Sequence, residues 1–178
     1  LGTELLMEFI GTDDEHGAVA APRLQETTPD AETAERWARL MREAVIDLAA
    51  LGLVHGDLSL DQVVADGHDL GLIDLDRAGR GNPLDDIASL LAAATPTALH
   101  AGGAARAAAL IDRLAAPFVA GHASTWRAGL SDDLGPRIAL ALLSRAGEPF
   151  RSGRPDWPGV TRELVGLAGS LASGRVAA

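Results

Sequence analysis

Three side chains with oxygen groups, all near the middle of the chain, have the types and spacing for chemistry with a hydroxyl group and a hard metal ion. Asp57 lies in the segment 55–62, which reads HGDLSLDQ and ends at Gln62, and Asp74 lies in the later segment 73–76, IDLD. Magnesium prefers oxygen ligands, so the Asp74 carboxylate and the Gln62 amide carbonyl are candidate metal ligands. Asp57 would then remain free to accept or orient the proton of a hydroxyl that attacks a phosphate.

A β-hairpin is expected to position these groups. The run 62–65 (QVVA) is rich in β-branched residues, 66–69 (DGHD) has turn chemistry, and 70–73 (LGLI) is a second apolar run. In an antiparallel hairpin the start of one strand lies beside the end of the other. Gln62 and Asp74 should therefore meet at the open end, where Asp57 also arrives.

A long helix is expected to lead into this segment. Apolar residues recur at steps of three and four from Trp37 to Leu51. The pair Thr28-Pro29 is a candidate cap before this helix, and Gly52 is a candidate stop after it. The helix would deliver the chain to His55, which we interpret as a residue that shapes the loop.

Further helices are predicted after the hairpin. One should begin at Asn82-Pro83 and hold Asp85 and Asp86 in its first turn, where the helix dipole favours carboxylates. Pro117 and Pro136 should kink or bound the later helices. Apolar residues at helical spacing mark these segments: Leu84, Ile87, Leu90, Leu91, Leu110, Ile111, Leu114, Phe118, Ile138, Ala141, Leu142, Val160, Leu164, Leu167 and Leu171.

Composition predicts one globular domain over residues 1–178, and the hairpin and helical patterns predict a fold that is mostly α with a small β-hairpin (α+β). A net charge of −10 without a basic run argues against nucleic acid and against an anionic membrane as partners. The longest stretch without formal charge, 87–105, is too polar to span a membrane. Cysteine is absent, and we expect a cytoplasmic protein. Abundant Ala, Arg and Gly without lysine resembles products of high-GC bacteria.

The motifs resemble those of the aminoglycoside phosphotransferase and choline kinase-like branch of the protein-kinase-like superfamily, which uses HGDLHxxN followed by a strand and IDFD or IDWE. The resemblance implies transfer of phosphate from ATP, with Mg²⁺, to the hydroxyl of a small molecule. It implies that Asp57 is the catalytic aspartate, and that Gln62 and Asp74 are metal ligands. At Gln62 the chain departs from the usual asparagine by one methylene.

Other segments extend the resemblance. Residues 81–88 (GNPLDDIA) resemble GDPxxDLA, which implies that Asp86 braces the catalytic loop, and Asp76 matches the second acid of IDFD. Glu8, Phe9 and Ile10, within a hinge-like strand over 1–12, match the segment whose backbone binds adenine. The resemblance assigns 53–80 to the catalytic loop, hairpin and metal segment, and 82–178 to the helical region of a kinase-like carboxyl-terminal lobe.

The nucleotide-binding half of the family is not apparent in this chain. No lysine occurs in the sequence, whereas the family pairs a strand lysine with the nucleotide phosphates beneath a glycine-rich loop. The chain opens at Leu1, almost directly on the hinge-like segment, so we expect that an amino-terminal lobe of ~100 residues is missing. We therefore expect weak activity or none from the chain alone, and a homodimer through the face that the missing lobe would cover.

Two alternatives stay open. The first is a non-catalytic, pseudokinase-like binding lobe that shares the ancestry of the family but not its activity. The second is a phosphatase of the haloacid dehalogenase type, in which Asp74 is the nucleophile and Asp76 the acid. The helical pattern downstream and the absence of lysine count against the phosphatase.

Overall fold

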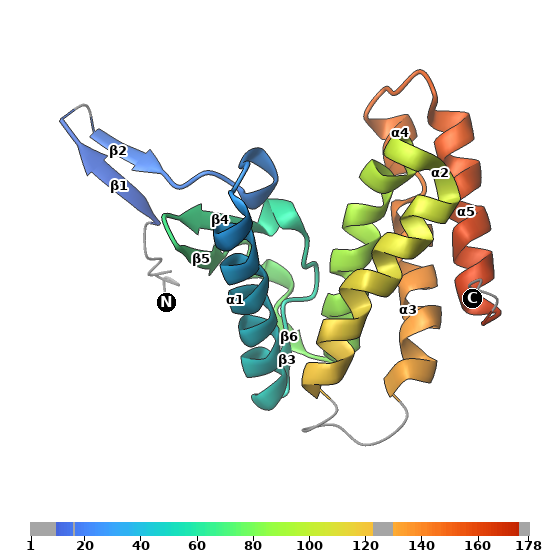
Figure 1. Cartoon of the computed structure of the whole chain (residues 1–178), viewed down its shortest axis with the longest axis horizontal. Coiled ribbons are helices and arrows are strands. Elements are labelled where there is room, and N and C mark those ends of the chain that lie inside the picture. The colour runs from blue at the N-terminus through green and yellow to red at the C-terminus, as the bar shows by residue number, and fades with distance from the viewer. Residues whose placement is uncertain (1–9, 16, 123–129, 175–178) are drawn as a thin grey trace, which may run out of the picture. The chain divides into compact units, whose positions relative to one another are not determined.

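The protein is mostly helical and carries short antiparallel sheets, which confirms the predicted mixture of α and β structure (Figure 1). A computed structural model describes residues 10–15, 17–122 and 130–174. The contacts divide the chain into two compact units. Unit 1 is Leu1–Met41 with Leu60–Asp74, and unit 2 is Arg42–Ser59 with Leu75–Ala178.

The predicted hairpin is present in unit 1. Strand β4 (Val63–Asp66) pairs antiparallel with β5 (Asp69–Leu72), and Val63 lies opposite Leu72. The intervening turn contains Gly67, whose φ of 60° favours a residue without a side chain. Val63, Val64 and Ala65 are all buried, so β4 is the inner strand of the hairpin.

A second hairpin in unit 1 was not predicted. Strand β1 (Gly11–Asp14) pairs antiparallel with β2 (Gly17–Ala20), and all four residues of β2 are exposed. After β2 the chain runs beside β4, where the Ala65 N–H donates to the Pro22 carbonyl at 2.9 Å. A short 3-10 helix, η1 (Leu24–Glu26), follows.

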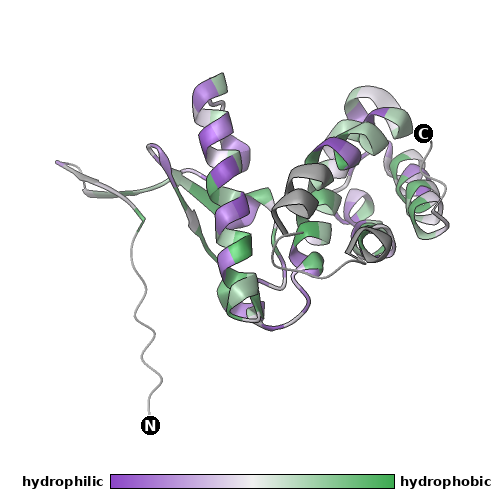
Figure 2. Cartoon of the chain, turned by 60° about the horizontal axis from the view of Figure 1, so that its bottom comes forward, coloured by the Kyte–Doolittle hydropathy of each residue, from purple (hydrophilic) through white to green (hydrophobic). Residues whose placement is uncertain are grey.

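Helix α1 (Ala31–Ala50) confirms the predicted long helix, but the predicted cap was wrong. The side chain of Asp30, not of Thr28, accepts the Thr33 N–H at 2.8 Å. This is the bond that a helix-capping residue makes. At the other end Gly52 has a φ of 70°, as a helix-stopping glycine requires. Figure 2 shows hydrophobic and hydrophilic residues mixed along α1, and its buried stripe consists of Trp37, Met41, Val45 and Ala49.

Unit 2 is a set of packed helices. Helix α2 (Leu84–His122) packs against α3 (Leu130–Arg145) and α5 (Trp157–Ala172), and the short α4 (Glu148–Arg151) packs against α5. Its core contains Leu84, Ile87, Leu91, Ile138, Leu142, Leu164, Leu167 and Leu171.

Pro117 and Pro136 were predicted to kink or bound helices, and neither proline ends one. Helix α2 continues past Pro117, and Pro136 lies inside α3. Helix α2 is broken instead at Gly102 and Gly103, which leave helical geometry. Glycine is a poor helix former and Gly103 takes a positive φ of 71°, which explains the site of the break. Within the described parts of the chain, no helix is both long and apolar enough to cross a membrane.

Candidate functional site

The predicted catalytic loop lies in unit 2, directly after a short strand. Strand β3 (Leu53–Val54) pairs antiparallel with β6 (Gly79–Arg80). The chain therefore enters the segment 55–62 beside the point where it leaves the segment 73–76. Within the loop, directly after His55, Gly56 has a φ of 85°. A Cβ at this position would collide with the carbonyl oxygen of Arg77. Glycine is therefore required both by the backbone conformation and by the lack of space.

The carboxylate of Asp86, in the first turn of α2, holds the backbone of this loop. Its two oxygens accept the N–H of His55 at 2.6 Å and the N–H of Gly56 at 2.9 Å. Asp86 and His55 are both fully buried. A buried carboxylate needs such partners because it has lost its water. The arrangement fixes the backbone immediately before Asp57.

Asp57 itself lies between two arginines. One carboxylate oxygen is 3.3 Å from a terminal guanidinium nitrogen of Arg77, and the other is 3.7 Å from one of Arg145. The Asp57 side chain keeps 42% of its surface exposed, so a small hydroxyl compound can still reach it. The next residues, Leu58 and Ser59, are buried.

The predicted metal ligands lie in unit 1 at the open end of the β4–β5 hairpin. The Ile73 N–H donates to the Gln62 carbonyl at 3.0 Å, and Asp74 follows directly. The hairpin thus brings the backbones of the two segments together, as predicted. Asp74 has a φ of 61° and is the sole non-glycine residue with a positive φ in the described ranges. Such a conformation is uncommon outside glycine and often marks a functional position.

The donor types at this hairpin end suit a hard cation. Asp74 is exposed and Gln62 is half-buried, and they offer carboxylate and amide oxygens. Among the residues that the structure describes, no three His, Cys, Asp or Glu side chains form a ready metal centre. A magnesium ion held by Asp74 and Gln62 would need nucleotide phosphates and water to complete its shell.

The remaining predicted residues divide between the two units. In unit 1, Glu8 and Phe9 lie outside the described residues, whereas the Ile10 carbonyl accepts the Ala21 N–H at 2.9 Å. The Ile10 side chain lies against Gly71 of β5, where an added Cβ would strike it. In unit 2, Asp76 is exposed in the 3-10 helix η3 (Leu75–Arg77).

Sequence reasoning missed both arginines beside Asp57. Arg77 follows the IDLD motif directly, and this position was the only sequence signal that it could lie near Asp57. Arg145 is the last residue of α3 and is distant from Asp57 in sequence. Its approach depends on how α3 packs, which no local pattern reveals.

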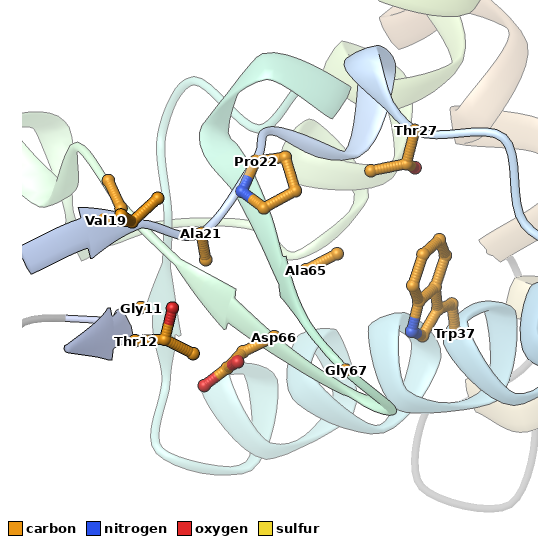
Figure 3. A pocket seen from close by; sticks show the side chains of 11 residues that line it. Gly11, Thr12, Val19, Ala21, Pro22, Thr27, Trp37, Ala65, Asp66 and Gly67 are labelled. Atoms are coloured by element: carbon orange, nitrogen blue, oxygen red, sulfur yellow. The ribbon is translucent and has the colours of Figure 1, made fainter. Parts of the chain in front are cut away.

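Unit 1 also contains a hollow of about 310 Å³ (Figure 3). Residues of β1, β2, the end of β4 and Trp37 of α1 line it. The indole N–H of Trp37 is buried and has no hydrogen-bond partner in the described structure. None of the predicted site residues lines this hollow, so it is separate from the hairpin end that carries Gln62 and Asp74.

Comparison with known proteins gives one family. A family model described as the phosphotransferase enzyme family (APH) matches residues 10–118, which is more than half of the 178 residues. The matched span includes the loop of Asp57, the hairpin with Gln62 and Asp74, and the brace Asp86. No curated protein and no solved structure gives a significant match.

Proposed function

Because the chain belongs to the phosphotransferase enzyme family, we propose that it carries the catalytic loop and metal segment of an ATP-dependent enzyme that phosphorylates the hydroxyl of a small molecule. The observation that carries the proposal is the loop 55–57. Buried Asp86 binds its backbone on one side, and the partly exposed carboxylate of Asp57 emerges from it. Phosphoryl transfer depends mainly on positioning and electrostatics, and a braced loop provides the positioning.

In this proposal Asp57 orients the acceptor hydroxyl and accepts its proton at a carboxylate oxygen as the hydroxyl oxygen attacks the terminal phosphate. The Asp74 carboxylate and the Gln62 amide oxygen would hold Mg²⁺. When bound, the ion would neutralise charge on the phosphate oxygens. Asp86 contacts neither substrate nor ion and acts only through the loop backbone. The residues of this chain thus divide into one that contacts the acceptor, two that hold the ion and one that supports the loop.

We further propose that these motifs form the carboxyl-terminal lobe of a kinase-like fold. In this family the nucleotide-binding half supplies a lysine that pairs with the nucleotide phosphates. The chain has no lysine. Turnover by this chain alone should therefore fall well below the range of about 1–100 per second that complete kinases show. A non-catalytic binding lobe is the second candidate, and the same absence of lysine favours it.

Mutation of the proposed residues tests the assignment. ADP release would be measured with Mg²⁺ and ATP, and Mg²⁺-dependent binding of a non-hydrolysable ATP analogue would be measured by calorimetry. Asp57→Ala should lower turnover by about 100-fold or more and leave nucleotide binding intact. Asp74→Ala should weaken Mg²⁺-dependent binding by about 10–100-fold. Asp69→Ala, at the first residue of β5 and at the opposite end of the hairpin from Asp74, is the control and should change neither quantity.

The outcomes separate the candidates. Unchanged turnover in the Asp57→Ala variant would remove Asp57 from the mechanism. Metal-dependent nucleotide binding without any ADP release from the unmutated chain would favour the binding lobe. A covalent phosphate on Asp74 would favour a phosphatase, which the family match through this motif argues against.

A further inference from the structure

We propose that Arg145 is a positioning residue that holds the carboxylate of Asp57 in place for proton transfer. This inference rests on the proposed function of Asp57. A terminal nitrogen of the Arg145 guanidinium lies 3.7 Å from one Asp57 carboxylate oxygen, and its other terminal nitrogen lies 3.1 Å from Glu148. Arg145 thus bridges the catalytic loop and the start of α4.

The restraint on Arg145 distinguishes it from Arg77, the other arginine beside Asp57. The Arg145 side chain is only 17% exposed, whereas the Arg77 side chain is 70% exposed. An ion pair between exposed side chains contributes little, because water screens it and ordering two long side chains costs entropy. The Arg145 guanidinium is mostly buried and is held by Glu148, so its side chain has already lost conformational freedom before it contacts Asp57. Arg145 therefore restrains Asp57 more strongly than Arg77 does.

The position of Arg145 is itself fixed by the packing of α3. Ile138 and Leu142 of this helix are buried, and Arg137 forms an ion pair with Asp85 in the first turn of α2. The neighbouring Asp86 binds the catalytic loop. The first turn of α2 therefore contacts both the loop backbone and the helix that carries Arg145.

The charges around Asp57 indicate restraint and not an anion-binding site. Arg77 and Arg145 contribute two positive charges, and Asp57 and Glu148 contribute two negative charges. The cluster is balanced, so it offers no excess positive charge to an anionic ligand. Holding the reacting group in a fixed orientation is what the balanced contacts can do, and small misplacements of such a group lower the rate strongly.

The test compares Arg145→Met and Arg145→Lys with Arg162→Met, an exposed arginine of α5 that serves as the control. In protein labelled with ¹³C-aspartate, the side-chain carboxyl resonance of Asp57 is identified by its loss in Asp57→Asn. Turnover and KM for ATP are measured by ADP release in the same variants, and thermal unfolding verifies that each is folded. These readouts separate a positional role from a general loss of structure.

We expect Arg145→Met to move the Asp57 resonance and to lower kcat by about 10–100-fold with little change in KM for ATP. Arg145→Lys should restore part of both effects, and Arg162→Met should show neither. In an Asp57→Asn background, Arg145→Met should have no further effect on turnover, because the group that it positions is gone.

An Asp57 resonance that stays in place in Arg145→Met would overturn the proposal, whether or not turnover is measurable. A moved resonance with unchanged kcat would also overturn it, since the contact would then have no role in catalysis. If Asp57→Asn retained full turnover, the proposed function of Asp57 would fail instead. The resonance would still decide whether Arg145 contacts this side chain.

Discussion

The carboxylate of Asp86 accepts the backbone N–H of Gly56 at 2.9 Å, although 30 residues separate the two in sequence. Its other oxygen accepts the N–H of His55. Asp86 belongs to the first turn of a packed helix, and Gly56 precedes the predicted catalytic aspartate. The conformation of the loop therefore depends on the core of unit 2, and changes at either end of this contact should affect stability and activity together.

Asp86→Ala should destabilise the protein by about 2–4 kcal/mol, because it leaves the buried His55 N–H and the part-buried Gly56 N–H without this acceptor. Asp85→Ala is the matched control. Asp85 is next in sequence but about half-exposed and paired with Arg137, so its loss should cost less than about 1 kcal/mol. Urea unfolding of the two variants measures the difference. Equal losses would contradict the bracing role of Asp86.

Gly56→Ala should cost more stability than Gly52→Ala. Both glycines have a positive φ, of 85° and 70°, so alanine carries a penalty of about 1–2 kcal/mol at either site. At Gly52 an added Cβ meets nothing within 4 Å, but at Gly56 it meets the Arg77 backbone. The collision should add about 1–3 kcal/mol. Urea unfolding would refute this expectation if the two variants were equally stable.

Asp74→Gly should be more stable than Asp74→Ala by about 1 kcal/mol, because the φ of 61° at this position suits glycine and strains alanine. Both variants remove the carboxylate, so both should lose Mg²⁺-dependent nucleotide binding to the same extent. Thermal unfolding and calorimetry together measure the two effects. If the alanine variant were the more stable, the left-handed conformation would not be the one present in solution.

Asp30 should make the stability of α1 depend on pH. The hydrogen bond from the Thr33 N–H lowers the pKa of the Asp30 carboxyl below its ordinary value of 3.8. A depressed pKa in the folded state means that the stabilisation is present above pH 3.8 and is lost as the pH falls through the folded-state pKa. Asp30→Ala should therefore unfold at a lower temperature than the unmutated chain near neutral pH.

The difference in unfolding temperature between Asp30→Ala and the unmutated chain should shrink as the pH falls below the folded-state pKa of Asp30. Both proteins then lack a charged cap on α1. Glu35→Ala, an exposed position of the same helix, serves as the control. Thermal unfolding followed by circular dichroism at several pH values provides the measurement. A difference that stayed constant down to strong acid would show that the Asp30 charge has no part in capping.

Local patterns predicted the elements that carry the site. Two apolar runs on either side of a turn segment predicted the hairpin that joins Gln62 to Ile73, and this pairing is observed. Helical spacing predicted α1 and the start of α2, where the Asn82 side chain accepts the Leu84 N–H. The predictions of the helix cap and of the helix break were wrong because a nearby residue took each role. Asp30 lies after Thr28-Pro29 and makes the capping bond itself, and the two adjacent glycines break α2 more effectively than its proline does.

The sequence by itself determined the type and order of the elements, the chemical groups at Asp57, Gln62 and Asp74, and the family, because these depend on residue spacing and on short motifs. Only the tertiary structure decided that Asp86 binds the loop through both oxygens and that Arg145 reaches Asp57. It also decided that Asp74 takes a left-handed backbone. The first two contacts join residues far apart in the chain, and the packing of helices, which no local pattern encodes, sets their distances.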